Sequence, residues 1–176
     1  MRRLQDFMAR MRRDERGVAA IEMGLIGSLF ILGLLNVGEI GRYAYTSMEV
    51  ATATQSSVAA ALAACDVAHL PATSNCAGLN AAVDTAVKST SLGTKVGLSG
   101  SLAEAYYCVS DLQKLTYVST PNSPPADCSA ANNPSALPAL YLKIATTYTY
   151  SPMFPGMTVV DSLPPQISQT AWTRMK

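Results

Sequence analysis

Charged side chains are scarce in this sequence. Asp, Glu, Lys and Arg together make up 14% of the 176 residues, well below the roughly 25% that is usual in soluble domains. Hydrophobic residues make up 49%, so part of the chain is expected to avoid water. A chain of this length has room for one ordinary domain together with a membrane anchor or a long helix, but not for two domains.

Signatures of catalysis and metal binding are also missing. The sequence has a single histidine, His69, and no glycine-rich phosphate loop, Ser-x-x-Lys motif or recognised pair of metal ligands. We expect His69 to be an exposed loop residue, and we expect the outer carboxylates to be solvated surface groups: Asp66, Asp84, Glu104, Asp111, Asp127 and Asp161. The sequence therefore predicts a protein that is not an enzyme and that needs no cofactor and no metal ion.

Positive charge is concentrated at the N-terminus. Residues 1–17 contain six Arg against Asp6, Asp14 and Glu15, a local charge of +3, and the rest of the chain carries −2. The sequence has no strongly basic patch with interleaved aromatic residues, so nucleic-acid binding has little electrostatic support. We do not expect nucleic acid as a partner.

One long apolar run follows the basic segment. Between Val18 and Gly38 only Glu22 is charged, and a helix of this length spans about 30 Å, enough to cross a lipid bilayer. The positive-inside rule keeps the basic flank in the cytoplasm and puts the C-terminal part outside. A buried helix of a soluble protein is one alternative, which the uncharged run from Met23 to Gly38 disfavours. A cleaved secretory signal is another, which the length of the run and the lack of a small-x-small site disfavour.

The helix is expected to continue beyond the apolar run. Glu39 to Ala64 contains no Pro and is rich in Ala, so one helix from Val18 to about Ala64 is predicted, with an amphipathic outer half. Glu39 and Arg42, three residues apart, can pair where the helix leaves the bilayer. The sequence LAAC at 62–65 is similar to a lipoprotein cleavage box, but charged and polar residues separate it from the apolar run, which disfavours lipid attachment to Cys65.

Beyond Cys65 the pattern changes to short elements separated by Pro, Gly, Ser and Asn, which indicates a compact domain with many turns. A helix is expected from Leu79 to Leu92, with Gly93 as its stop, and 121–138 is expected to be a loop. Strands are predicted where apolar and polar residues alternate or Tyr, Val, Ile and Thr are frequent, at 105–109, 114–119, 140–150 and 166–173. The predicted fold class is α+β, with a long N-terminal helix, membrane-spanning in its first half, packed on a small disulfide-stapled antiparallel sheet.

Four cysteines lie on the C-terminal side of the apolar run, at Cys65, Cys76, Cys108 and Cys128. Their spacing lacks the close pairs typical of zinc sites. In an oxidising compartment an even set of this kind indicates disulfides. Three pairings are possible, and we favour Cys65 with Cys76 and Cys108 with Cys128.

The residues at the start of the apolar run have a specific pattern. Gly17 directly precedes the run, and Glu22 is the fifth residue after it, in the sequence RGVAAIEM at 16–23. This is the pattern of type IV prepilins, in which a short basic leader is cut off after the glycine. The segment resembles the TadE-like minor pilins (pseudopilins) of the tight-adherence (Tad/Flp) type IV pilus system. LIG at 25–27, EIGRYAY at 39–45 and FPG at 154–156 are also similar to that family.

The resemblance implies a structural function in pilus biogenesis and adhesion. A prepilin peptidase would cut between Gly17 and Val18, which gives a leader at 1–17, a helix at 18–64 with its membrane segment at 18–38, and an extracytoplasmic domain at 65–176. The expected partners are the peptidase, the inner-membrane assembly machinery, the lipid bilayer and other pilin subunits, which bind through the N-terminal helix. The expected location is the bacterial inner membrane, single-pass with the C-terminal domain in the periplasm, and then the pilus.

Two features of the helix fit assembly. A carboxylate inside a bilayer costs at least ~2.5 kcal/mol and usually marks function, so Glu22 is expected to pair with an amine, that of Val18 after cleavage or that of a neighbouring subunit. Snorkelling of Glu22 to the cytoplasmic interface is the alternative. Ala20, Gly24 and Ser28 recur every four residues and form a face on which another helix can approach closely; chance glycines facing lipid are the alternative there.

Two other classes of protein remain open at this point. One is an uncleaved, membrane-anchored binding or assembly module, whose Cys-rich domain holds a ligand or a partner. The other is an anchored periplasmic enzyme, which would need a pocket that contains His69. Cleavage after Gly17 discriminates the pilin from the uncleaved module.

Overall fold

The computed structural model describes residues 15–176, and the side chains from residue 17 onward. Most of the expected leader therefore lies outside the described residues. The described chain forms two compact units. The first consists of residues up to 42 together with 152–163, and the second of residues 43–151 together with 164–176.

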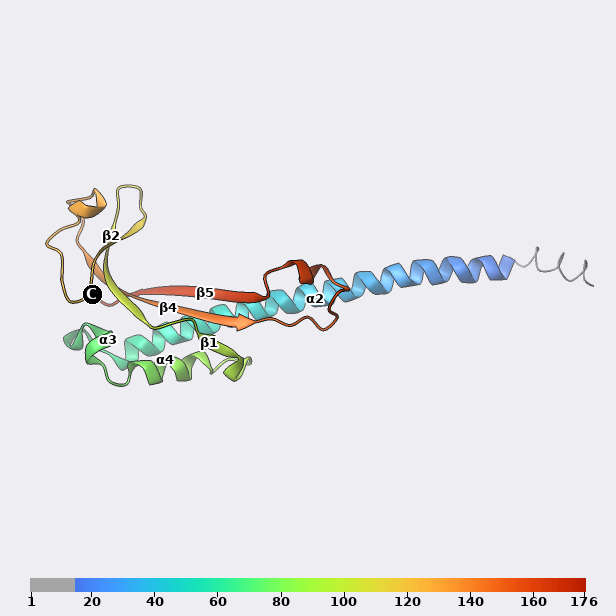
Figure 1. Ribbon diagram of the computed structural model, residues 1–176, viewed down its shortest axis with the longest axis horizontal. Helices are drawn as coiled ribbons and strands as arrows, with labels where there is room; N and C mark the ends of the chain where they lie inside the picture. The colour runs from blue at the N-terminus through green and yellow to red at the C-terminus, as the bar shows by residue number, and fades with distance from the viewer. Residues whose placement is uncertain (1–14) are drawn as a thin grey trace, which may run out of the picture. The chain divides into compact units, whose positions relative to one another are not determined.

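One long helix, α2, begins at Glu15 and ends at Ala64, so the predicted uninterrupted helix is confirmed (Figure 1). Its sequence contains no Pro, which would remove a hydrogen bond and force a kink. In the second unit, one face of α2 is buried, at positions three and four apart, as expected for an amphipathic helix: Thr46, Val50, Ala53, Thr54, Ser57 and Ala61. In the first unit, every residue of α2 from 17 to 34 is exposed except the half-buried Gly27.

The second unit contains one antiparallel sheet. Its strands are β1 (Val96–Leu98), β2 (Ala103–Val109), β3 (Leu115–Ser119), β4 (Ala139–Thr149) and β5 (Gln166–Arg174). The central strand β4 pairs with β5 along one edge and with β2 and β1 along the other, and β3 continues from β2. β4 alternates buried residues, Leu140, Leu142, Ile144 and Thr146, with partly exposed ones, which is the period-two pattern of a half-buried strand.

The buried face of the sheet packs on the second half of α2. The hydroxyl groups of Thr54 on α2 and Thr146 on β4 lie 2.6 Å apart, and β4 and β5 run alongside α2 (Figure 1). Helix α4 (Leu79–Val87) lies against α2 as well, because Ser56 donates a hydrogen bond to the carbonyl of Ala86 at 3.1 Å. The α+β class and the antiparallel sheet packed on the helix are therefore confirmed.

Helix α4 ends earlier than expected. The sequence predicted a helix to Leu92, but α4 ends at Val87, because its buried positions, Leu79, Val83 and Val87, have no apolar successor one turn later. Gly93 has a φ of +56° and opens a short 3-10 helix, Gly93–Lys95, instead of stopping α4. The three-residue strand β1 and the four-residue helix α3 (Ala72–Asn75) were not predicted.

The environment of Glu104 also differs from the expectation. This residue on β2 was predicted to be a solvated surface group, but it is buried, with 7% of its surface exposed. Its carboxylate accepts hydrogen bonds from the backbone N–H groups of Ala72 and Thr73, at 3.0 and 2.9 Å, and from the Thr73 hydroxyl at 2.9 Å. Glu104 thus caps α3, whose first N–H groups have no partner within the helix.

Candidate assembly interface on the N-terminal helix

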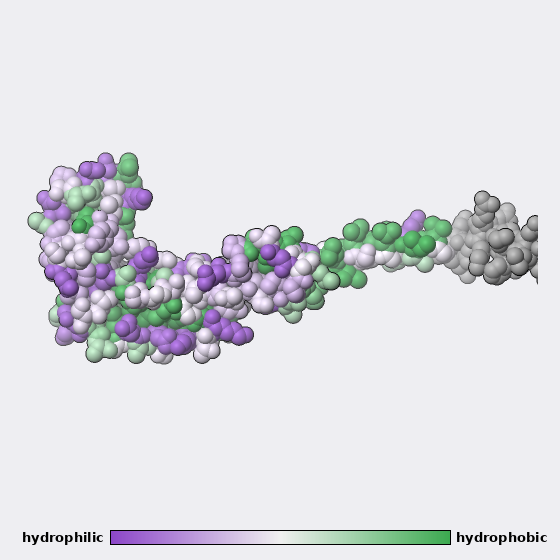
Figure 2. All heavy atoms as spheres, in the orientation of Figure 1, coloured by the Kyte–Doolittle hydropathy of each residue, from purple (hydrophilic) through white to green (hydrophobic). Residues whose placement is uncertain are grey.

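The residues that the sequence singled out for processing and assembly all lie on the first part of α2, within the first unit. Gly17, Val18, Ala20, Glu22, Gly24 and Ser28 are all exposed. Other exposed residues of this segment are large and apolar, including Ile21, Leu25, Leu29 and Phe30, and the space-filling view shows hydrophobic residues over its length (Figure 2). This helix is long and apolar enough to cross a membrane, and its most apolar stretch has no part buried inside the described structure.

The small residues of the segment have no packing role inside the described chain. A Cβ atom built on Gly17, Gly24 or Gly27 would meet nothing within 4 Å apart from the helix itself. The Ser28 hydroxyl donates a hydrogen bond to the carbonyl of Leu25 at 2.8 Å. Because this donor is satisfied within the helix, the Ser28 side chain can face an apolar neighbour. The face formed by Ala20, Gly24 and Ser28 is therefore open to another helix.

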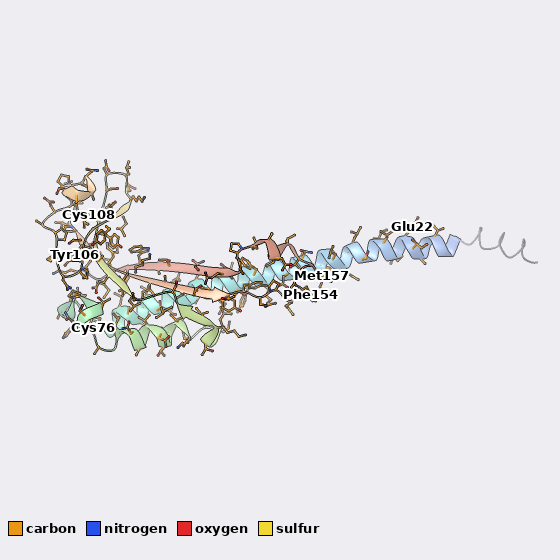
Figure 3. The ribbon with its side chains drawn as sticks, in the orientation of Figure 1. Glu22, Cys76, Tyr106, Cys108, Phe154 and Met157 are labelled. Atoms are coloured by element: carbon orange, nitrogen blue, oxygen red, sulfur yellow. A yellow bond between two sulfur atoms is a disulfide. The ribbon has the colours of Figure 1, made fainter. Side chains whose placement is uncertain are left out.

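Glu22 points away from the helix axis (Figure 3). The ion pairs between Arg or Lys and carboxylates among the residues that the structure describes lie elsewhere, at Glu39 with Arg42 and Asp84 with Lys88. No hydrogen bond joins the Glu22 carboxylate to any described side chain or backbone group. A carboxylate in this position in a membrane would require a cation or hydrogen-bond donor that the described side chains do not supply.

At the far end of the first unit, α2 is joined to a loop, residues 152–163. Asn36 accepts a hydrogen bond from the backbone N–H of Val159 at 2.8 Å and donates one to the carbonyl of Leu32 at 2.9 Å. Glu39, only 3% exposed, accepts one from the N–H of Met153 at 3.2 Å and lies 3.6 Å from the Arg42 guanidinium. The Glu39–Arg42 pair expected from the sequence is therefore present, and sequence reasoning missed the role of Asn36.

Both disulfides favoured from the sequence are present in the second unit. Cys65 is bonded to Cys76, and Cys108 to Cys128, and no described cysteine is free. The second bridge is fully buried and packs with Ala131 in a small apolar cluster. Figure 3 shows Cys76 and Cys108 on different parts of this unit, so each bridge closes a different loop.

His69 lies in the loop closed by the first disulfide. Its side chain is 65% exposed, and its Nδ1 is 3.2 Å from the carboxylate of Asp66. The pKa of Asp66 is lowered mainly by the hydrogen bond from the Ala68 N–H, and secondly by the hydrogen bond with the His69 ring. His69 is therefore an exposed neighbour of a local N-cap, because Asp66 caps the 3-10 helix Val67–His69.

An aromatic cluster on the sheet was not foreseen from the sequence. The Tyr107 ring makes edge-to-face contacts with Tyr117, Tyr141 and Trp172, at centroid distances of 5.9, 6.0 and 5.0 Å, and the Lys143 ammonium lies 5.4 Å from the Trp172 ring. Burial, followed by the proximity of Tyr117, raises the pKa of Tyr107. Strand register brings these residues together, with Tyr107 opposite Tyr117 and Lys143 opposite Trp172. The one sequence signal that could have indicated this cluster is the frequency of Tyr in the predicted strands.

Between residues 15 and 176 no group of three or more His, Cys, Asp or Glu side chains is placed to hold a metal ion. Comparisons of the chain with protein-family models, with curated proteins and with solved structures gave no match.

Proposed function

We propose that this chain is a TadE-like minor pilin, a structural subunit that is anchored in the bacterial inner membrane, cut by a prepilin peptidase and assembled into a type IV pilus of the tight-adherence system. One observation carries the proposal. The first part of α2 is exposed and apolar, and it carries the Glu22 carboxylate, which has no partner among the described residues, beside a face of small residues. The second part of the same helix packs one face into a domain.

The position of Glu22 supports assembly as the reason for this arrangement. In a bilayer the carboxylate costs several kcal/mol unless a cation or hydrogen-bond donor accompanies it. Cleavage between Gly17 and Val18 would create an α-amino group four residues away, one helical turn along α2. That amine, or the same amine of a neighbouring subunit, would neutralise Glu22 when helices associate.

The small face supports close contact between subunits. In lipid, helices associate through van der Waals packing of small residues, because lipid chains are as apolar as the side chains that they contact. The open space around Gly24 leaves room for the backbone of another helix. The two disulfides of the second unit fit an oxidising compartment such as the periplasm, which agrees with a basic leader in the cytoplasm.

An assay of assembly tests the proposal, with variants expressed in cells that carry a complete pilus system. Glu22→Ala removes the charge that assembly would pair and makes the free helix easier to keep in lipid. Its level in membranes should therefore hold or rise, while its level in sheared pili falls. Glu22→Gln, which keeps the size of the side chain but not its charge, should behave like Glu22→Ala.

A pair of matched leucine variants tests the small face. Gly24→Leu should reduce incorporation into pili because it blocks close approach. Gly33 is nine residues further along, which places it on roughly the opposite side of the helix at 3.6 residues per turn, and a Cβ there also meets nothing within 4 Å. Gly33→Leu should therefore assemble normally. Normal incorporation of both Gly24→Leu and Glu22→Ala would leave α2 as a simple anchor and would contradict the proposal.

A second candidate function is an uncleaved membrane-anchored binding module. The aromatic cluster around Tyr107 and Trp172 favours it, because aromatic side chains are enriched at binding surfaces. In that case the N-terminus would stay intact, and substitution of the small face would leave the function of the protein unchanged. The two candidates therefore differ in the fate of residues 1–17.

A further inference from the structure

The loop 152–163 exposes an unusual amount of apolar surface for a short connection. Met153 is 64% exposed and Met157 63% exposed, and the other large apolar side chains that reach solvent are Phe154, Val159 and Leu163. Figure 3 shows Phe154 and Met157 on this loop beside α2. Asp161 is the only charged residue between positions 152 and 163, so the exposed surface of the loop is predominantly apolar.

The loop is fixed to α2 at a defined level. The Val159 N–H binds the Asn36 side-chain oxygen at 2.8 Å, and the Met153 N–H binds the Glu39 carboxylate at 3.2 Å. These two anchors on the helix are three residues apart, so they lie on one face about one turn from each other. The depth of the loop therefore follows the depth of Asn36 and Glu39.

That depth is the outer boundary of the apolar segment. Asn36 is 18 residues beyond Val18, a rise of about 27 Å, while the hydrocarbon core of a bilayer is about 30 Å thick. With Val18 at the inner boundary, Asn36 lies just inside the outer one. A polar amide there is tolerated when its hydrogen bonds are made within the protein, and both functional atoms of Asn36 have such partners.

The backbone of the loop is also suited to this position. Pro152 and Pro155 have no N–H group, which leaves ten in the segment. Seven of the ten have an acceptor within the same unit: those of Met153, Gly156, Met157, Thr158, Val159, Asp161 and Leu163. Asp161 itself accepts from Gly156 at 2.8 Å and Thr158 at 3.4 Å. Most of the backbone N–H donors of the loop can therefore leave water without losing their hydrogen bonds.

We infer that the loop 152–163 is a second membrane contact, which inserts Met153, Phe154, Met157 and Val159 into the interfacial region of the outer leaflet beside the transmembrane helix. The ligand is the lipid surface itself. Apolar and aromatic side chains favour this boundary layer, and the anchors at Asn36 and Glu39 hold the loop there. The inference rests on the membrane anchor of the proposed function, but not on cleavage or on assembly into a pilus.

Depth-dependent fluorescence quenching tests this inference in the full-length chain. The protein has one tryptophan, Trp172, so Trp172→Phe provides a background free of tryptophan. Single tryptophans are then introduced as Phe154→Trp and, independently, as Met157→Trp. Phe30→Trp serves as a reference within the apolar helix, and Leu137→Trp as a reference at an exposed position of the second unit. Each variant is reconstituted in phosphatidylcholine–phosphatidylglycerol vesicles that carry a nitroxide on the lipid, either near the headgroup or near the end of the acyl chain.

The expected result is specific to depth. The Phe154→Trp and Met157→Trp variants should emit to the blue of Leu137→Trp and be quenched most by the shallow nitroxide. The Phe30→Trp variant should be quenched most by the deep nitroxide, and the Leu137→Trp variant by neither.

Three other outcomes are distinguishable. Quenching of Phe30→Trp without quenching of the two loop variants would overturn the inference and leave the membrane anchor intact. A blue shift of Phe154→Trp without lipid quenching, rising with the protein-to-lipid ratio, would also overturn it, because a second copy of the chain would then cover the loop. Absence of quenching in Phe30→Trp would contradict both the anchor and this inference.

Discussion

The hydroxyl groups of Thr54 on α2 and Thr146 on β4 lie 2.6 Å apart, and both side chains are buried. Thr54 also donates to the carbonyl of Val50 at 2.7 Å. Since a hydroxyl has one proton to donate, Thr146 must be the donor between the two threonines. This pair is a buried hydrogen bond between helix and sheet, and it fixes the position of α2 on β4.

Substitution of the two threonines should therefore be coupled. Thr146→Val removes one hydrogen bond and should lower the free energy of unfolding by about 1 kcal/mol, whereas Thr54→Val leaves the buried Thr146 hydroxyl without its acceptor and should cost about 1–3 kcal/mol. The double variant should lose less than the sum of the two. Denaturation of the full chain in detergent, followed by Trp172 fluorescence, measures these values. Thr52→Val on the exposed side of α2 is the matched control, and additive losses would show that the two hydroxyls do not interact.

Glu104 should be important for the stability of the second unit although it was expected to be a surface group. Glu104→Gln replaces one acceptor oxygen with an N–H₂ group, which then faces an N–H donor of α3. We therefore expect the free energy of unfolding to fall by about 1–3 kcal/mol. The exposed Asp111 provides the control, because Asp111→Asn should have an effect within about 0.5 kcal/mol. The same denaturation assay distinguishes them. Equal effects of the two substitutions would argue against the capping role of Glu104.

The two disulfides should contribute unequally to the free energy of unfolding of the second unit. The chain-entropy estimate for loops of 11 and 20 residues is about 3 kcal/mol in both cases, but Cys108 and Cys128 are also fully buried. Replacing both of these by Ala should therefore destabilise the unit more than replacing Cys65 and Cys76 by Ala. Peptide mapping without reductant should recover only the two pairs described. Recovery of another pairing, or of free thiols from periplasmic protein, would contradict the structure of this unit.

The pH dependence of the Asp66 loop has a defined sign. Because the pKa of Asp66 is lowered in the folded chain, its contacts stabilise the loop above the ordinary pKa of the carboxyl group, and this contribution is lost as the pH falls through the lowered value. His69→Ala should raise the pKa of Asp66 only part of the way back, since the Ala68 N–H is the larger cause. NMR titration of the carboxyl carbons measures the change. The pKa of Asp127, which is lowered by hydrogen bonds from Ser129, should not change in His69→Ala. A full return of the Asp66 pKa to its ordinary value would show that His69, and not the Ala68 N–H, is the larger cause.

The parts of the fold that the sequence predicted are those set by local pattern. The apolar run from Val18 to Gly38 and its Pro-free, Ala-rich continuation to Ala64 predicted α2, and the residue pattern from Leu140 to Tyr150 predicted β4. The parts that it did not predict depend on partners distant in the chain. Burial of Glu104 depends on a hydrogen bond from Thr73, 31 residues away, and the hydrogen bond that Asn36 accepts comes from Val159, 123 residues away. No periodicity within one segment reports such pairs, so a polar residue that is satisfied by a distant loop looks the same as a solvated one.

The fate of residues 1–17 distinguishes a processed pilin from an uncleaved anchor, and mass spectrometry of the N-terminus measures it. The protein should be purified both from membranes and from sheared pili of cells that carry the complete pilus system. We predict a mature chain that begins at Val18, has lost the +3 leader, and is not cut after Ala64. Gly17→Ala should slow this cleavage. A chain that keeps residues 1–17 in both fractions would contradict the account and would favour an uncleaved membrane-anchored module.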